Sequence, residues 1–411
     1  MPNNNDTLST AKTAQNDEYY TLYEDIQNEI NRYVEYNPDV FKGKTILLPC
    51  DDPEWSNFTK FFAQNFETLG LKKLISTSYA TESKNKVIPE GYQFSLFDFL
   101  TDYEKNSPNY DETKTMNKGK VFVLTRDVND SGVIDYDDLE WDYLEGDGDF
   151  RSNEVTSLRD EADIIITNPP FSLFREFMAW IMEAKKQFLI LGNPNLLSKR
   201  DIFPLIKDNK IWVGCKSMSK DSYFIIPEKY KARLLEDSTE GSGYKTIDGV
   251  VYGRSQAIWY TNLEHGRRHG SIPLMSMEDN LKYSKHKGSS KWAFAYKKFE
   301  NYDAIEVPFV NSIPNDYKNT MAVPISFIDQ YCPEQFEILG RTGDIIWCNE
   351  HCTFFTPCSE EMQKKLKKAN STWRVQNAYM MVNDKAVTFY DRIFIKYTDD
   401  WIINHPENFK D

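Results

Sequence analysis

The 411-residue chain lacks a long hydrophobic run, paired cysteines and an excess of basic residues. Because no stretch of about 18 uncharged apolar residues occurs, an ordinary transmembrane helix is excluded. Residues 1–16 are polar and hold no hydrophobic signal segment, so they predict a flexible tail and no export signal. We therefore expect a soluble, cytoplasmic protein, and its length favours two domains.

Cysteine is scarce and scattered, with six residues and no C-x-x-C pair. This pattern is typical of reduced thiols in a cytoplasmic protein. One group, Cys348, His351, Cys352 and Cys358, offers the ligand types of a zinc site. Its spacing departs from that of zinc ribbons, and ordinary core cysteines in a strand-rich segment explain it more simply.

The net charge of −14 is unfavourable for a protein that approaches nucleic acid, but the charge is unevenly distributed. Residues 127–163 contain fourteen acidic and two basic residues, so one segment carries nearly the whole imbalance. Residues 251–300 contain nine basic and four acidic residues. The chain therefore has room for a local basic face.

Two halves of the chain differ in their hydrophobic pattern. Residues 45–191 alternate short apolar runs with helix-patterned stretches, which is typical of crossover units and a largely parallel sheet. Strands are predicted at 45–48, 74–75, 121–124, 163–167 and 188–191, and helices at 58–69, ended by Gly70, and at 174–181. Beyond about Lys220 the chain is richer in β-branched and aromatic residues, with strands expected at 250–252, 257–260, 336–339 and 393–395. The sequence thus predicts an α/β domain followed by a strand-rich α+β region.

The tetrapeptide Asn168-Pro169-Pro170-Phe171 directly follows an apolar strand and precedes an amphipathic helix. It is therefore expected at the carboxyl end of a parallel strand, where open α/β sheets bind ligands. The Asn168 side-chain oxygen and the Pro169 carbonyl can accept the two hydrogens of an amino group conjugated to a base. The nitrogen lone pair can then point at a methyl sulfonium. The prolines hold the carbonyl rigidly, and Phe171 offers an aromatic face to a base turned out of a duplex.

The alternative is that the two prolines only end the strand and that Phe171 packs in the core. In an arbitrary loop the tetrapeptide would favour that interpretation. Here the position of the motif and the chemistry of its residues agree. We therefore interpret Asn168, Pro169, Pro170 and Phe171 as catalytic residues.

Further sequence blocks extend this pattern over most of the chain. They are 17–21 (DEYYT), 50–53 with 56–58 (CDDP, SNF), 146–152 (GDGDFRS), 167–175 (TNPPFSLFR), 189–193 (LILGN), 210–214 (KIWVG) and 323–327 (VPISF). Together they resemble the EcoRI-type adenine-specific DNA methyltransferase family, most strongly from residue 17 to about 214. The resemblance implies a Rossmann-like S-adenosylmethionine-dependent methyltransferase domain at 17–220 and a DNA target-recognition region at 221–411.

The same resemblance implies which residues bind S-adenosyl-L-methionine. The loop after the first strand would hold the methionine end, an acid-aromatic pair would bind and stack on the adenine, and an N-terminal motif would close over the methionine moiety. The loop residues are Asp51, Asp52, Ser56 and Asn57, and the acid-aromatic pair is Asp149 and Phe150. The N-terminal motif is Tyr20 and Thr21. Asn168 would also contact the cofactor. The usual Gly-x-Gly is missing, so the choice between Asp51 and Asp52 stays open, and both could instead form a solvated helix N-terminus. No carboxylate ends the second strand, so the sequence identifies no ribose ligand.

The acidic segment contains a pattern similar to an EF-hand calcium loop. Its oxygen-bearing residues at positions 1, 3, 5, 9 and 12 are Asp127, Asn129, Ser131, Asp135 and Asp138. Position 5 is serine, position 12 is aspartate instead of glutamate, and the preceding segment VFVLTR is strand-like instead of helical. An ordinary turn rich in Asp, Asn, Ser and Gly is the simpler interpretation, and methyl transfer needs no metal.

We therefore expect a site-specific DNA adenine N6 methyltransferase that flips its target adenine out of double-stranded DNA, with a restriction endonuclease of a restriction-modification system as a separate partner. The residues expected to contact DNA are Arg267, Arg268, Lys282, Lys285, Lys287 and Lys291. The same motif also serves enzymes that methylate cytosine N4, RNA adenine or glutamine side chains. A catalytically silent acidic binding protein is the remaining alternative, and it would have no reason to bind S-adenosylmethionine.

Overall fold

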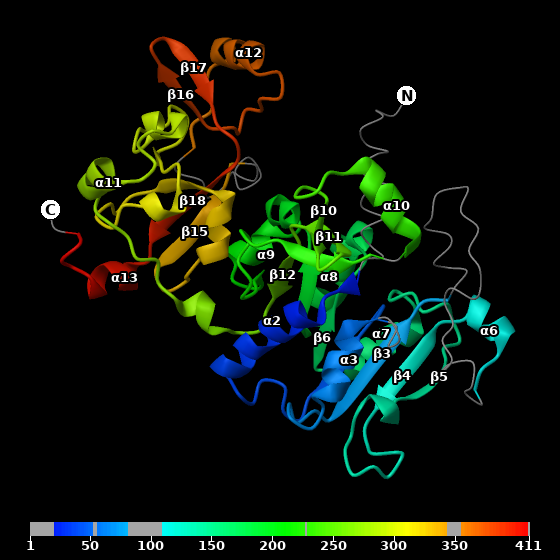
Figure 1. The fold of residues 1–411 in the computed structure, drawn as a ribbon. Helices are drawn as coiled ribbons and strands as arrows, with labels where there is room; N and C mark the ends of the chain where they lie inside the picture. Colours follow the sequence, from blue (N-terminus) through cyan, green and yellow to red (C-terminus); the bar gives the residue numbers. More distant parts are fainter. Residues whose placement is uncertain (1–19, 52–55, 81–108, 227, 343–354, 410–411) are drawn as a thin grey trace. The chain divides into compact units, whose positions relative to one another are not determined.

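The computed structural model describes residues 20–51, 56–80, 109–226, 228–342 and 355–409 (Figure 1). Internal contacts divide the chain into two compact units. The first unit comprises 1–196 and 211–265, and the second comprises 197–210 and 266–411. None of the helices within the described ranges is long and apolar enough to cross a membrane.

The first unit is built on an eight-stranded mixed sheet. In spatial order its strands are β5 (Glu140–Tyr143), β4 (Lys120–Leu124), β3 (Lys73–Ser78), β2 (Thr45–Leu48), β6 (Ile164–Thr167), β7 (Gln187–Gly192), β12 (Ile258–Thr261) and β8 (Trp212–Val213). The four central strands, β3, β2, β6 and β7, are parallel. On one flank β4 pairs antiparallel with β3, and on the other β12 pairs antiparallel with β7. The α/β class and the predicted strands are confirmed, but the sheet is parallel only at its centre.

Helices cover this sheet because its central strands are apolar on both faces. The main helices of the first unit are α2 (Tyr23–Tyr36), α3 (Asn57–Gln64), α6 (Glu112–Asn117), α7 (Asn153–Glu161), α8 (Phe174–Glu183) and α10 (Glu228–Asp237). Apolar side chains of α2 and α3 share one core with alternate residues of the strands, such as Ile46 and Leu48. The intervening Leu47 is equally buried, which places a second apolar layer on the other face.

The predicted helix 58–69 is shorter than expected, since α3 ends at Gln64. The Asn65 side chain donates a hydrogen bond to the Phe61 carbonyl at 2.8 Å and so occupies a carbonyl of the last turn. The chain then turns through Gly70, which has a left-handed φ of 64°. The predicted helix at 174–181 is confirmed as α8.

A second, antiparallel sheet in the first unit joins the N-terminal segment to residues beyond 220. Its order is β1 (Tyr20–Thr21), β9 (Ser222–Ile225), β11 (Val250–Ser255) and β10 (Tyr244–Ile247). Thr21 pairs with Phe224 across about 200 residues of sequence. This pairing fixes the position of the N-terminal motif within the first unit.

The second unit contains short helices, a four-stranded sheet and a hairpin. The sheet order is β13 (Ile305–Glu306), β14 (Met321–Pro324), β18 (Arg392–Tyr397) and β15 (Phe336–Arg341), and the hairpin is β16 (Tyr379–Val382) with β17 (Lys385–Thr388). The helices are α9 (Phe203–Lys207), α11 (Met277–Tyr283), α12 (Glu360–Ala369) and α13 (Asp399–Asn404). Buried Leu366 of α12 packs with Trp373 and Tyr379, so helix and hairpin form a small core of their own.

Candidate active site

The candidate site lies where the central strands end. β2 stands between β3 and β6, so the chain first moves to one side of β2 and later continues on its other side. Such a reversal is a topological switch point, and ligands bind there at the carboxyl ends of the strands. Because β2, β3 and β6 are parallel, the segments 49–51, 79–80 and 168–171 emerge at this same edge.

Asp51 is a buried carboxylate at this edge, with an exposure of 6 %. Its Oδ1 accepts a hydrogen bond from Ser56 Oγ at 2.7 Å, and its Oδ2 accepts one from Thr167, the last residue of β6. The hydroxyl of Ser76 and, at 3.3 Å, that of Thr59 donate to the Asp51 carbonyl. Asp51 is therefore anchored by β3, α3 and β6 together, whereas Asp52 lies outside the described residues.

Cys50 lies in the loop after β2, where the resemblance leads one to expect a Gly-x-Gly sequence that this chain lacks. Its φ of 71° lies in the left-handed region that glycine favours. Its thiol lies 3.5 Å from the Tyr79 hydroxyl. The chain thus makes the tight turn before Asp51 with a cysteine, which the side chain of Tyr79 contacts.

The Asn168-Pro169-Pro170-Phe171 motif connects β6 to α8 at the same edge. Pro169 is buried, while Asn168, Pro170 and Phe171 are half-buried. Phe171 begins a short 3₁₀ turn and packs partly against the main core of the first unit. The predicted position of the motif, after a parallel strand and before a helix, is confirmed.

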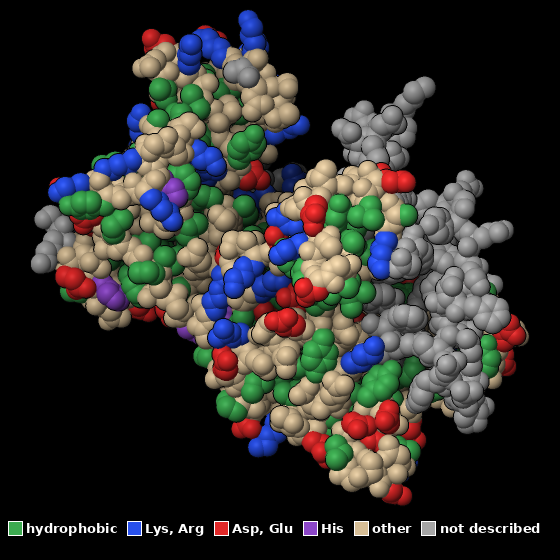
Figure 2. Space-filling view, viewed as in Figure 1, with side chains coloured by type: hydrophobic (Ala, Val, Ile, Leu, Met, Phe, Trp, Pro, Cys, Tyr) green, Lys and Arg blue, Asp and Glu red, His purple; other side chains and the backbone are tan. Residues whose placement is uncertain are grey.

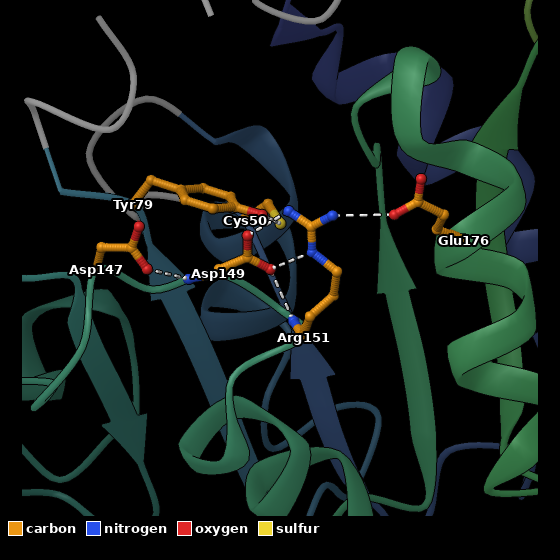
Figure 3. A network of polar contacts seen from close by, with 6 residues as sticks. All are labelled: Cys50, Tyr79, Asp147, Asp149, Arg151 and Glu176. Atoms are coloured by element: carbon orange, nitrogen blue, oxygen red, sulfur yellow. Dashed lines mark hydrogen bonds and ion pairs between the residues drawn. The ribbon is translucent and has the colours of Figure 1, made fainter. Parts of the chain in front are cut away.

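A network of polar contacts surrounds Asp149 beside the end of β3 (Figure 3). Arg151 donates from Nε to Asp149 Oδ1 at 2.9 Å and from Nη2 to Oδ2 at 2.7 Å, and its Nη1 donates to Glu176 Oε2 of α8 at 2.9 Å. The Asp147 carboxylate accepts a hydrogen bond from the Asp149 amide at 3.1 Å. Burial alone would raise the pKa of the Asp149 carboxyl, but the hydrogen bonds from Arg151 outweigh it and hold that pKa below its usual value.

The loop that carries Asp149 packs tightly onto the end of β3. The Ala80 amide donates to the Asp147 carbonyl at 2.8 Å. Gly148 has a φ of 87°, and a Cβ at this position would overlap the Ser78 carbonyl oxygen. Glycine is therefore required at position 148, and this requirement explains how the GDGD segment comes so close to the candidate site.

Phe150 lies in the core and does not line an open site. It is fully buried, and its ring makes edge contacts with Phe177 at 5.0 Å and Trp180 at 5.5 Å between centroids. In Figure 3 the side chain of Tyr79 reaches Cys50 and lies beside Asp149. Burial, followed by the neighbouring Cys50, raises the pKa of the Tyr79 hydroxyl, so it remains protonated and can donate a hydrogen bond.

The N-terminal motif is brought to the loop that follows Asp51. The Asn57 side chain donates to the Thr21 carbonyl at 2.8 Å, so β1 is tied to the start of α3. Thr21 is 5 % exposed, and its Oγ1 has no hydrogen-bond partner among the described residues. Tyr20 contributes backbone pairing to Ile225. The structure therefore brings Thr21, Asp51, Ser56 and Asn57 together.

The six basic residues expected to contact DNA have different surroundings. Arg267 forms an ion pair with Asp329 at 2.8 Å, and Arg268 is buried and donates to Asn209 at 3.1 Å. Both arginines therefore stabilise the second unit internally. The exposed members of the group are Lys282, Lys285, Lys287 and Lys291.

The calcium-like loop directs its oxygen atoms at its own backbone. Asp127 accepts from the amides of Ser131 and Gly132, and Asp138 accepts from those of Val128, Asn129 and Asp135 at 2.8–3.2 Å. Ordinary turn hydrogen bonds thus account for the Asp/Asn/Ser pattern. Within the described ranges no group of three or more His, Cys, Asp or Glu residues could hold a metal ion.

The zinc alternative at the C-terminal cysteines falls mostly beyond the described residues, which exclude Cys348, His351 and Cys352. Cys358 is half-buried and packs beside the small core of α12. Burial raises the pKa of its thiol above the ordinary value.

Sequence reasoning missed three residues that shape the site: Tyr79, Arg151 and Glu29. Glu29 of α2 is 2 % exposed and accepts hydrogen bonds from the amides of Cys215 and Lys216 at 2.6 and 2.8 Å. This contact fixes α2, and with it the neighbouring β1. The sequence offered one signal for Glu29, namely a carboxylate on the apolar face of a helix. A carboxylate buried there needs hydrogen-bond donors, which indicates a structural contact.

Comparison with known proteins gives consistent matches over nearly the whole chain. The family model described as adenine-specific methyltransferase EcoRI matches residues 7–398. The Type II methyltransferase M.EcoRI of Escherichia coli is 38 % identical over 355 residues, which cover 85 % of this chain and 95 % of that protein. The Type II methyltransferase M.MpnI of Mycoplasma pneumoniae is 32 % identical over 333 residues, covering 81 % and 84 %. No solved structure matches the chain significantly.

Proposed function

Because the chain belongs to the EcoRI family of adenine-specific DNA methyltransferases, we propose that it methylates the N6 amino group of an adenine turned out of double-stranded DNA. The observation that carries this proposal is the position of Asn168-Pro169-Pro170-Phe171. The motif follows β6 at the edge where Asp51 follows β2. Thr167, which hydrogen-bonds Asp51, directly precedes Asn168, so the two candidate binding regions are adjacent.

The motif residues can activate an otherwise weak nucleophile. The Asn168 side-chain oxygen and the Pro169 carbonyl accept the two N6 hydrogens, which favours a tetrahedral nitrogen with an available lone pair. Pro170 restricts the backbone at that carbonyl. Phe171 provides a half-exposed ring on which the flipped base can stack.

S-adenosylmethionine supplies the methyl group, and the described residues suit it. The buried Thr21 hydroxyl and the Asp51 carboxylate offer polar partners for its amino acid end, with Ser56 and Asn57 holding the loop. Asp149 offers an acceptor for the adenine amino group. We assign Tyr79 to the aromatic contact expected of Phe150, because the Phe150 ring is enclosed by α8. Asp52 and Tyr20 remain cofactor candidates on the resemblance alone.

We assign methyl transfer to a Rossmann-like domain that begins near residue 17 and DNA recognition to the part of the chain after residue 220. The parallel centre of the main sheet and its switch point at β2 support the first assignment. Residues 221–265 pack within the first compact unit, so we place the main recognition surface at 266–411. We also propose that the enzyme acts in the cytoplasm and that a separate restriction endonuclease is its partner.

Exposed lysines in the second unit provide the proposed contacts to phosphates. Lys282, Lys285, Lys287 and Lys291 form one group. A second group lies on α12, and Figure 2 shows basic side chains gathered over this helix and the β16–β17 hairpin; its lysines are Lys364, Lys365, Lys367 and Lys368. The negative net charge of the chain therefore does not exclude a local basic surface.

The test is methyl transfer from tritium-labelled S-adenosylmethionine to duplex DNA, followed by digestion to nucleosides. We expect label in N6-methyldeoxyadenosine, and a parallel mapping of methylated positions in intact DNA should find them at one recurring sequence. Label in N4-methylcytosine, or transfer only to RNA, would instead support a different conjugated amino group. A protein that neither binds the cofactor nor transfers label would support the silent acidic binding protein.

A further inference from the structure

Arg151 joins the candidate cofactor residue Asp149 to the helix that follows the catalytic motif (Figure 3). Three hydrogen bonds run from Arg151 to Asp149: the backbone amide at 2.8 Å, Nε at 2.9 Å and Nη2 at 2.7 Å. The remaining arm, Nη1, donates to Glu176 at 2.9 Å. Because a guanidinium is planar and rigid, it fixes the direction between the two carboxylates.

Glu176 belongs to the first turn of α8, which begins at Phe174, three residues after Phe171. A change in the position of α8 must therefore move the end of the catalytic motif. The residue between Asp149 and Arg151 reinforces the connection, since the Phe150 ring packs against Phe177 of the same turn. The Arg151 guanidinium also lies 5.4 Å from the centre of the Phe150 ring.

Stability alone does not account for this arrangement. The side chains of Arg151 and Glu176 are 51 % and 58 % exposed, and ion pairs at such exposure add little to folding stability. The buried ring of Phe150 already attaches the segment to α8. The ion pair is therefore better suited to setting an orientation than to holding the fold.

We propose that Arg151 is a positioning residue that couples occupancy of the cofactor site at Asp149 to the placement of the Asn168–Phe171 motif through Glu176. This inference rests on the proposed function. Arg151 holds Asp149 and the first turn of α8 in one fixed arrangement. A cofactor bound at Asp149 would therefore lie in a defined position relative to the target-base pocket.

Two substitutions separate this role from simple cofactor binding. Glu176→Met leaves the Asp149–Arg151 pair intact, so cofactor affinity should stay within about twofold, while the single-turnover rate of methyl transfer falls about tenfold. Arg151→Met should weaken cofactor affinity about tenfold and lower the rate to a similar extent. In the double variant the rate should be no lower than with Arg151→Met alone, because both changes break one connection.

A matched control is Arg32→Met, which removes an ion pair to Glu35 at 3.0 Å with side chains of similar exposure on α2. It should change neither affinity nor rate, and melting curves verify that each variant folds. If Arg151→Met fails to fold, Glu176→Met alone decides the question. Rates that multiply in the double variant, or an unchanged rate in Glu176→Met, would overturn the coupling alone. A wild-type protein that transfers no methyl group would overturn the proposed function, and the coupling with it.

Discussion

The hydroxyl of Thr167, the last residue of β6, donates a hydrogen bond to the carboxylate of Asp51, which follows β2. The Thr167 hydroxyl also lies 2.7 Å from the Pro49 carbonyl, so both ends of the loop around Cys50 are held by one side chain. Thr167 is fully buried. This hydroxyl thus links the two regions proposed for base and cofactor directly.

Thr167→Val should weaken cofactor binding and lower stability. Valine keeps the shape of the side chain but leaves the Asp51 carboxylate and the Pro49 carbonyl without this donor, at a cost of about 1–3 kcal/mol in the free energy of unfolding. Thr167→Ser retains the hydroxyl and should restore cofactor affinity. Titration calorimetry with S-adenosylmethionine and melting curves measure both effects. Equal cofactor affinity in the valine and wild-type proteins would show that the hydroxyl does not position Asp51 for binding.

Replacing Lys282, Lys285, Lys287 and Lys291 by glutamine should weaken DNA binding and reduce its salt dependence. Each phosphate contact that is lost should flatten the slope of log K against log salt by roughly one. The control replaces Lys42, Lys44, Lys72 and Lys185, which precede parallel strands and so lie at the opposite edge of the main sheet from the candidate site. Both variants change the net charge equally. If the two variants show the same slope of log K against log salt, these four lysines of the second unit do not contact DNA phosphates.

The position of the Asn168–Phe171 motif in the fold could be predicted because it depends on local signals. The apolar run Ile164–Ile166 lies in β6 (Ile164–Thr167), and Pro169 prevents the strand from continuing. The spacing of Phe174, Phe177 and Ile181 predicts the helix that follows. These signals lie within about 20 residues of one another. The parallel centre of the sheet follows from the same alternation of strands and helices.

Residues whose surroundings depend on distant partners could not be assigned from the sequence. The sequence places Arg267 and Arg268 in a basic cluster. In the structure Arg267 pairs with Asp329 and Arg268 with Asn209, each partner lying about 60 residues away in the sequence. The resemblance implies a stacking role for Phe150, and nothing local in the sequence reveals the contacts of its ring with Phe177 and Trp180. The antiparallel flanks of the sheet are likewise tertiary pairings that no local pattern specifies.

Stability should depend on pH through Asp138. Burial alone would raise the pKa of this carboxyl, but three backbone amide donors outweigh it, so the folded pKa lies below the unfolded value of about 3.9. A carboxyl group whose pKa is lower in the folded state stabilises the fold at pH values above its unfolded-state pKa. This stabilisation is lost as the pH falls through the folded-state pKa. Asp138→Asn should therefore lower the melting temperature at neutral pH, with the difference from wild type shrinking below about pH 4.

Calcium should leave the melting temperature of the wild-type protein unchanged, because the loop oxygens already accept hydrogen bonds from the backbone. Melting curves in chelator and in millimolar calcium provide the comparison. A rise in melting temperature with calcium that Asp138→Asn abolishes would establish a metal site in place of the turn.

Asn168→Ala should remove methyl transfer while largely sparing cofactor binding. In the proposed function Asn168 acts on the target amino group, whereas Thr21, Asp51 and Asp149 contact the cofactor, so the two functions should separate. Loss of an oriented acceptor in the transition state costs about 3 kcal/mol or more, roughly a hundredfold or greater in rate. Asp149→Ala should do the reverse and mainly weaken cofactor affinity.

Phe171 provides the complementary test of base capture. Phe171→Ala should weaken the complex with the flipped adenine by about 1–3 kcal/mol, while Phe171→Tyr and Phe171→Trp keep a π face and should retain activity. Tritium transfer to an adenine-containing duplex and calorimetric cofactor affinity are measured for every variant. Since Phe171 also packs partly against the core, melting curves separate lost stacking from lost stability. An Asn168→Ala protein that methylates adenine at the wild-type rate would rule out the mechanism, because no other residue of the motif offers a side-chain acceptor to the amino group.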